Sequence, residues 1–226
     1  MITPADFWLA DVGPRLVVMD VDSTFLRQEV IEELADRAGK RDEVTRITTA
    51  AMRGELDFAQ SLEQRVATLA GLPATIFDEV RSTLQLNDGV KHFITALQAA
   101  GWPVGLVSGG FNQVVQPLAA EHGIRLARAI TLEVVDGQLT GKTTGPIVTR
   151  VAKAEILREF AGQAGLPVEQ AIAIGDGAND IDMVTLAQVG IAFNAKPALR
   201  AVADVVVDGP MDQLLAPFGL SAAGGK

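Results

Sequence analysis

The sequence contains no cysteine and only two histidines among its 226 residues. Disulfides, thiolate metal sites and a cysteine nucleophile are therefore excluded. A zinc site or a catalytic triad that uses histidine would have to be built around His92 or His122. Carboxylates, lysines and backbone amides must carry most of the chemistry.

Basic residues are also few, since 19 Lys and Arg stand against 28 Asp and Glu, giving a formal net charge of −9. So acidic a chain argues against nucleic acid or an anionic membrane as its partner. Residues 93–120 carry no charged side chain, but glycines, Pro103 and polar residues interrupt the run that a membrane span would need. Residues 1–6 lack the character of a secretory signal. We therefore expect a cytoplasmic protein.

Short apolar runs alternate with helical patterns, which is typical of a parallel sheet with crossover helices. Strands are expected at 15–20, 102–108, 171–176, 189–193 and 203–207. Each run is too short for a helix and lacks alternation, so these strands should be buried on both faces. Helical patterns lie at about 91–100, 113–121, 151–163 and 179–186.

Two segments depart from this alternation. Residues 27–86 hold 19 charged side chains against 28 in the other 166 positions, and glycines divide them into three or four helices. Asp136-Gly137 between β-forming runs predicts a hairpin at 130–144. The sequence therefore predicts an α/β protein with a Rossmann-like parallel-sheet core domain from residues 1–26 and 87–226. An inserted helical cap at 27–86 and a β-hairpin flap complete it.

Three of the expected strands end in polar side chains, namely Asp20, Ser108 and Asp176. Ligands of open parallel sheets bind beyond the carboxyl ends of the strands, so three distant segments aim polar groups at one crevice. A single strand-end Asp or Ser is most often a turn or helix-capping residue. The three together favour a binding or catalytic site.

The acidic groups at these strand ends predict a cation site. Asp20 and Asp22 lie two residues apart, and a cation or a shared proton would relieve their repulsion. The segment Gly175–Asp180 supplies further acidic groups, although a glycine-rich turn that caps the next helix is the simpler interpretation. Ligands that are all oxygen select a hard ion such as Mg²⁺.

A phosphate site is the second hypothesis. Ser108 is followed by Gly109 and Gly110, and a hydroxyl before two glycines lets backbone N–H groups close around a phosphate. A plain Gly-Gly turn is the alternative. Lys153, early in an expected helix, would taken alone most often be a solvated lysine.

These segments resemble, in order, the four motifs of the haloacid dehalogenase superfamily of phosphotransfer enzymes. Asp20–Thr24 matches DxD[ST], Ser108 the strand-end serine, Lys153 the lysine, and Gly175–Asp180 the motif GDGxND. P-type ATPases share part of this set, but they carry threonine where this chain has Asp22, and they span membranes. The resemblance therefore implies a hydrolase.

Within that superfamily the chain resembles the phosphoserine phosphatase family, from about residue 15 to 208. Glu29 stands at the last position of the pattern DxDSTxxxxE. A cap pattern is matched by Met52, Gly54, Phe58, Ser61, Arg65 and Val66. Phe25 and Ala154 depart from the family pattern without touching a charged position. The resemblance implies Mg²⁺-dependent hydrolysis of O-phospho-L-serine through an aspartyl-phosphate intermediate, the last step of serine biosynthesis.

The resemblance also implies a role for each residue. Asp20 is the expected nucleophile, and Asp22 the general acid and then base. Mg²⁺ is expected on Asp20, the backbone carbonyl of Asp22, and Asp176, with Asp180 orienting water beside it. The expected phosphate-binding residues are Ser108, Gly109 and Lys153. The expected substrate-binding residues are Glu29 for the amine, Arg65 for the carboxylate, Met52, Phe58 and Asn179.

Several alternatives stay open at this point. From spacing alone, Glu29 and Arg65 are as readily solvated helix residues, and Met52 and Phe58 cap-core residues. A related phosphotransferase, or a phosphatase for another small phosphomonoester such as phosphohomoserine, is the rival enzyme. A non-catalytic relative would be expected to lack one of the motif residues. The expected partner is a small phosphomonoester, not nucleic acid or membrane, and a homodimer is compatible with the sequence.

Overall fold

The computed structural model describes residues 13–53 and 55–220, without the side chain of Met52. Residues 1–6, where no secretory signal is expected, and Gly54 of the cap pattern lie outside that part. No helix in the described part of the chain has the length and apolarity needed to cross a bilayer.

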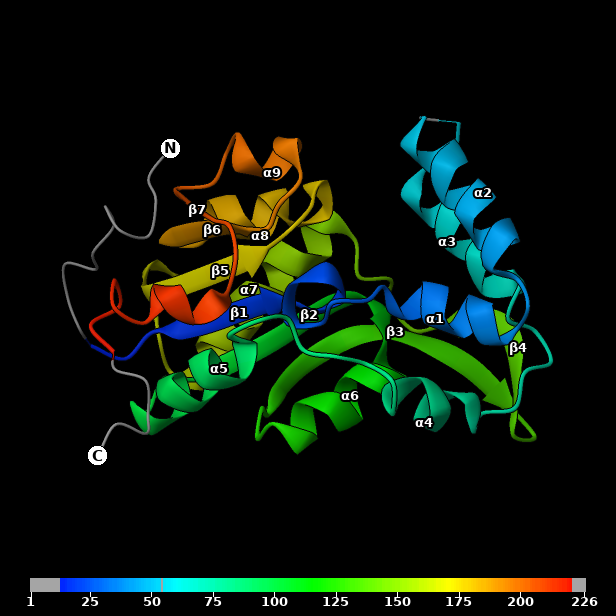
Figure 1. Ribbon diagram of the computed structural model, residues 1–226, viewed down its shortest axis with the longest axis horizontal. Helices are drawn as coiled ribbons and strands as arrows, with labels where there is room; N and C mark the ends of the chain where they lie inside the picture. The colour runs from blue at the N-terminus through cyan, green and yellow to red at the C-terminus, as the bar shows by residue number, and fades with distance from the viewer. Residues whose placement is uncertain (1–12, 54, 221–226) are drawn as a thin grey trace.

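One sheet forms the centre of the molecule (Figure 1), with the strand order β4-β3-β2-β1-β5-β6-β7. Its strands are β1 (Leu16–Asp20), β2 (Val104–Phe111), β3 (Leu126–Val135), β4 (Gln138–Thr144), β5 (Ala171–Gly175), β6 (Val189–Phe193) and β7 (Val205–Val207). Every neighbouring pair is parallel except β3 and β4. The predicted α/β class with a parallel-sheet core is confirmed.

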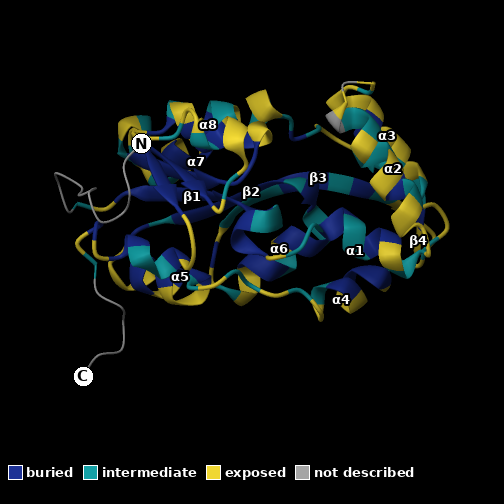
Figure 2. Cartoon of the chain, turned by 45° about the horizontal axis from the view of Figure 1, so that its top comes forward, coloured by how far each residue is buried: buried dark blue, intermediate teal, exposed yellow. Residues whose placement is uncertain are grey.

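Helices cover both faces of this sheet. They are α5 (Val90–Ala99), α6 (Asn112–Glu121), α7 (Arg150–Ala164), α8 (Ile181–Leu186) and α9 (Pro197–Arg200). Figures 1 and 2 show α5 and α6 on one side of the strands and α7 and α8 on the other. This follows from the strand order. Crossover connections between parallel strands are right-handed, so connections that move along the sheet in opposite directions lie on opposite faces. The central strands β1 and β5 are consequently buried along their whole length.

Strand β2 differs from the sequence-based expectation, which ended it at Ser108. The strand runs through Gly109 and Gly110 to Phe111, and its pairing with β3 is irregular between Val107 and Phe111. Helix α6 begins at the next residue, so no separate loop follows the strand. Pairing of Phe111 with Ile130 holds the glycines in the sheet despite their weak preference for strands.

Between β1 and α5 the described residues form a π-helical turn at Val21–Phe25 and four α-helices, α1 (Val30–Arg37), α2 (Arg41–Met52), α3 (Phe58–Ala67) and α4 (Ile76–Arg81). Figure 1 shows α2 and α3 standing away from the sheet as a pair, and Figure 2 shows their mostly exposed surfaces. Asp57 and Gln60 form a reciprocal capping box that starts α3. The chain leaves and re-enters the core side by side, because the Arg27 amide donates to the Gln85 carbonyl at 2.9 Å.

The hairpin of β3 and β4 reaches under these helices. Asp136-Gly137 forms its turn, with Val135 paired to Gln138. The free edge of β4 is held by the segment after α3, since the Gly71 amide donates to the Leu139 carbonyl at 2.8 Å and the Leu139 amide to the Leu72 carbonyl at 2.9 Å. Hairpin and helices thus share backbone hydrogen bonds at the end of the sheet that bears the polar residues.

Candidate active site

Three buried carboxylates meet where β1 and β5 end. Asp20 is the last residue of β1, Asp176 follows β5, and Asp180 lies in the turn before α8. One carboxylate oxygen from each lies within 4.8 Å of the others, which suits a metal ion. Oxygen donors of this kind fit a hard divalent cation. Asp20 and Asp176, which are 156 positions apart in the sequence, thus meet because the carboxyl ends of parallel strands lie at the same edge of the sheet.

Asp180 is fixed by the backbone as well as by charge. Its Oδ2 accepts hydrogen bonds from the amides of Asp176 and Gly177, both at 3.1 Å. A Cβ at Gly175 would lie 2.4 Å from the Asp180 Cγ, so the strand must end in glycine for the carboxylate to sit there. Asp180 therefore belongs to the acidic group itself.

Lys153 lies beneath the carboxylates with only 1% of its surface exposed. Its Nζ is 2.7 Å from Asp20 Oδ1 and 2.7 Å from Asp180 Oδ1. Burial alone would lower the pKa of Lys153, but the two carboxylates more than offset this and raise the pKa above its usual value. Burial, followed by the charge of Asp180, raises the pKa of Asp20 well above its usual range, with Lys153 opposing. The lysine is therefore the counterion of two aspartates.

Asp22 points away from this group and bridges two other elements. Its Oδ1 accepts the Val30 amide at 2.7 Å, at the start of α1, and its Oδ2 accepts the Ser108 hydroxyl at 2.7 Å. The Ser108 oxygen in turn accepts the Gly110 amide at 2.7 Å. A Cβ at Gly110 would lie 2.9 Å from Asp22 Oδ2, so this approach requires glycine. Asp22 is thereby held ready beside Asp20 without joining the acidic group.

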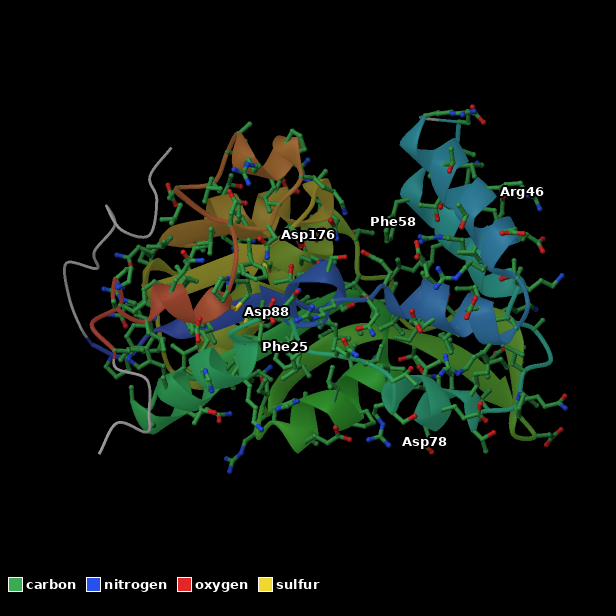
Figure 3. All side chains as sticks on the ribbon, viewed as in Figure 1. Phe25, Arg46, Phe58, Asp78, Asp88 and Asp176 are labelled. Atoms are coloured by element: carbon green, nitrogen blue, oxygen red, sulfur yellow. The ribbon has the colours of Figure 1, made fainter. Side chains whose placement is uncertain are left out.

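A cavity of about 160 Å³ opens above Asp20 and is closed on its far side by the helices α1 and α3. It is lined by Asp20, Asp22, Glu29, Ile31, Phe58, Leu62, Arg65, Gly109, Gly110, Asp176, Asn179 and Lys196. Figure 3 shows Phe58 at α3 and Asp176 at the end of β5 on opposite sides of the opening. Residues of the helices and residues of the sheet therefore share one cavity.

The helical segment contributes one acidic side chain, Glu29 at the start of α1, and one basic side chain, Arg65 of α3, to this cavity. Burial, followed by the charge of Asp22, raises the pKa of Glu29 to about 7, while a hydrogen bond from Ser23 opposes the rise. Burial lowers the pKa of Arg65, whose Nε donates to the Ser61 carbonyl at 3.2 Å. The two side chains form no ion pair with each other in the described part of the chain. The carboxylate of Glu29 and the guanidinium of Arg65 are therefore both available to pair with a ligand.

The cavity unites most of the residues expected from the sequence. Three expected residues, Ser108, Lys153 and Asp180, are buried beneath its surface and do not line it. The Met52 side chain lies outside the described part, so its position in the site stays a prediction.

Three lining residues escaped the sequence reading, namely Ile31, Leu62 and Lys196, whereas Gly110 belonged to the predicted phosphate site. Lys196 Nζ lies 3.0 Å from Asp176 Oδ2, and its amide donates to the Asp176 carbonyl at 2.8 Å. It stands just beyond β6, so the strand-end rule could have found it.

A mostly parallel sheet whose strand ends present a buried aspartate, its lysine counterion and further aspartates defines the class: an α/β protein with an acidic site whose carboxylates could hold a cation. The chain belongs to the haloacid dehalogenase-like hydrolase family, whose model matches residues 17–185.

Several relatives of this chain are named phosphoserine phosphatase. The chain is 54% identical over 217 residues to phosphoserine phosphatase SerB2 of Mycobacterium tuberculosis, covering 96% of this chain and 53% of that one. It thus spans about half the length of that relative and of the one from Streptomyces coelicolor. It is 50% identical to the phosphoserine phosphatase of Streptococcus thermophilus, covering 86% of this chain and 91% of that protein.

Solved structures agree in fold. A phospho-aspartyl intermediate analogue of phosphoserine phosphatase superposes with a TM-score of 0.83 at 38% identity, covering 90% of this chain and 98% of that one. A substrate-bound phosphoserine phosphatase complex superposes with a TM-score of 0.80 at 39% identity, covering 86% and 93%.

Proposed function

We propose that this chain is a Mg²⁺-dependent phosphatase that hydrolyses O-phospho-L-serine to L-serine and phosphate, the last step of serine biosynthesis. The observation that carries the proposal is the cavity that unites a buried, lysine-paired Asp20 with Glu29 and Arg65. Phosphoryl chemistry at one wall and two opposite charges at the other fit an amino acid phosphate. The names of the relatives support the same substrate.

The reaction begins with the carboxylate of Asp20 attacking phosphorus to form an aspartyl-phosphate. Lys153 favours the ionised form of Asp20 against the effect of burial and fixes its orientation, since one Asp20 oxygen lies 2.7 Å from the lysine. The amide of Gly109 at the cavity wall is suited to the phosphate oxygens, together with Ser108 and Lys153 beneath it. Most of the barrier reduction in such reactions comes from positioning and charge.

Asp22 is the proton donor and acceptor in this proposal. Serine is a poor leaving group as an alkoxide, so Asp22 would protonate its oxygen and later take a proton from the attacking water. Its two hydrogen bonds, from Val30 and Ser108, hold it beside Asp20. Without Asp22 the phosphorylated Asp20 should accumulate.

Mg²⁺ would be held by Asp20, Asp176 and the backbone carbonyl of Asp22, with Asp180 beside them. The donor set fits, because the described carboxylates are all oxygen ligands whose atoms converge within 4.8 Å. When bound, such a cation supplies charge that offsets the approach of an anionic nucleophile to an anionic ester.

Substrate recognition belongs to residues 27–86, which we propose form a cap over the core of residues 1–26 and 87–226, with the hairpin at 130–144 as a flap. Glu29 pairs with the substrate ammonium and Arg65 with its carboxylate in a bidentate fork. Phe58 supplies an apolar wall, and Met52 is expected beside it. Asn179, exposed at the cavity rim, contacts the substrate from the core side.

The test is phosphate release from O-phospho-L-serine with Mg²⁺, beside O-phospho-L-threonine and p-nitrophenyl phosphate. A strong preference for phosphoserine, lost in Glu29→Gln and Arg65→Met, supports the proposal. Asp20→Asn should be inactive, and Asp22→Asn should trap phosphate on the protein, seen as a mass increase. Equal slow turnover of all three esters would refute the substrate. Transfer to an added alcohol in place of water would indicate a phosphotransferase.

A further inference from the structure

Ser23 has a backbone conformation that its side chain does not favour. Its φ is +58° and its ψ 0°, in the left-handed region. Only Asp136 and Asn194 share a positive φ among the non-glycine residues of the described part, and Asp and Asn tolerate that region better than Ser. Such a conformation is unfavourable and persists only where surrounding contacts impose it. The strain therefore calls for a reason.

The contacts that impose it come from the far side of the helical insertion. The side-chain amide of Asn87 donates to the carbonyls of Ser23, Thr24 and Leu26 at 3.1, 2.9 and 2.9 Å. Asn87 stands where the chain returns from the helices to the core, and its own amide donates to the Phe25 carbonyl at 3.0 Å. One asparagine thus clamps the turn that follows Asp22.

The consequence of the clamp is the direction of the Ser23 hydroxyl. It donates to Glu29 Oε1 at 2.8 Å. The described part of the chain offers no hydrogen bond to Oε2, although Glu29 lines the cavity. The neighbouring Asp22 holds the Val30 amide, so the residues on either side of this contact are fixed as well.

We propose that Ser23 is a positioning residue for substrate specificity: its hydroxyl holds one oxygen of Glu29 so that the other meets the ammonium group of the substrate. The proposal rests on the proposed function, because it takes Glu29 to bind the substrate amine. A hydrogen bond to a carboxylate is directional and among the stronger ones, so it restricts the rotation of a side chain with three dihedral angles. Substrates that lack an ammonium group should bind no more tightly because of this hydrogen bond.

Two substitutions separate the hydroxyl from the backbone. Ser23→Ala and Ser23→Gly both remove the hydroxyl, but only glycine adopts a positive φ without strain. Stability should therefore follow the backbone, with the Gly variant melting above the Ala variant. The KM should instead follow the hydroxyl and rise equally in both. If the role of Ser23 is purely structural, the KM should instead rise less in Ser23→Gly than in Ser23→Ala, because glycine adopts the positive φ without strain.

The substrates are O-phospho-L-serine and 3-phosphooxypropanoate, which is phosphoserine without its amino group. For both variants we expect the KM for phosphoserine to rise about tenfold, as the loss of a hydrogen bond to a charged group allows, while kcat changes less than about twofold. The KM for 3-phosphooxypropanoate should stay at the wild-type value. The Glu29→Gln variant gives the KM that is expected when amine recognition is lost completely.

The outcomes are distinct. If wild type prefers phosphoserine and Glu29→Gln abolishes that preference while both Ser23 variants keep it, the role of Ser23 is wrong and the proposed function stands. An equal rise of KM for both substrates also refutes it, because the whole turn is then disturbed. If wild type handles both substrates alike, the amine-reading function itself fails and the inference with it.

Discussion

Replacing Lys153 by methionine should destabilise the protein strongly, and by an amount that depends on pH. The lysine is fully buried and bonded at 2.7 Å to both Asp20 and Asp180. Removing one partner of a buried ion pair costs about 3–5 kcal/mol, whereas an exposed pair contributes roughly 0–1 kcal/mol. Total stabilities lie near 5–15 kcal/mol, so the loss at pH 7 is a large fraction.

The pH dependence follows from Asp20. Its folded-state pKa already lies above the ordinary value because of burial and Asp180, and Lys153 is what opposes the rise. Without the lysine the pKa of Asp20 rises further, so the folded variant binds a proton that the unfolded chain releases. A raised carboxyl pKa means that stability is regained as pH falls through it. The deficit of Lys153→Met should therefore shrink between pH 7 and pH 5.

Urea unfolding of wild type and Lys153→Met at both pH values measures this. With a slope of about 1–3 kcal/mol per molar urea, a loss near 4 kcal/mol moves the midpoint by roughly 1.3–4 M. Lys91→Met is the matched control, since Lys91 is exposed on α5 and forms no ion pair within the described residues. A loss below about 1 kcal/mol at pH 7, or an identical loss at pH 5, would refute the role of Lys153 as a shared counterion.

Three further predictions follow from the site. The KM for phosphoserine should rise as pH falls below about 7, because Glu29 with a pKa of about 7 becomes neutral, and steady-state kinetics with 3-phosphooxypropanoate should show no such rise. Asn87→Ala should lower the unfolding free energy by about 1–3 kcal/mol through three orphaned carbonyls, while Gln85→Ala should change it little in the same denaturation assay. Gly110→Ala should lower kcat at least about tenfold with normal folding by circular dichroism, since its Cβ would press on Asp22.

The order of polar residues along the chain was enough to predict where the site lies. Asp20 and Asp176 follow buried apolar runs, and the geometry of parallel sheets places such ends together. That reasoning uses a property shared by all parallel sheets, so it needs no side-chain detail. The same rule covers Lys196 after β6, but a lone lysine among six carries no local signal that separates it from a solvated one.

The errors arose where tertiary contacts override local preference. The expected strand ended at Ser108, yet pairing of Phe111 with Ile130 carries β2 through Gly109 and Gly110. The strained conformation of Ser23 is likewise set by Asn87, 64 positions away, so no window of sequence around Ser23 contains the cause. Side-chain partners of this kind depend on the complete fold.

The charges at the centre of the site support the proposal of a divalent cation there. Asp20, Asp176 and Asp180 bring three carboxylates within 4.8 Å, and among the residues that the structure describes only Lys153 is a cation buried against them. Lys196 reaches Asp176, but with 62% of its side chain exposed its contribution is screened by water. A phosphate monoester brings up to two more negative charges, which the lysines alone would leave uncompensated at low dielectric. An oxygen-ligated Mg²⁺ held by these carboxylates would supply that positive charge, so the proposed metal and the proposed anionic substrate support each other.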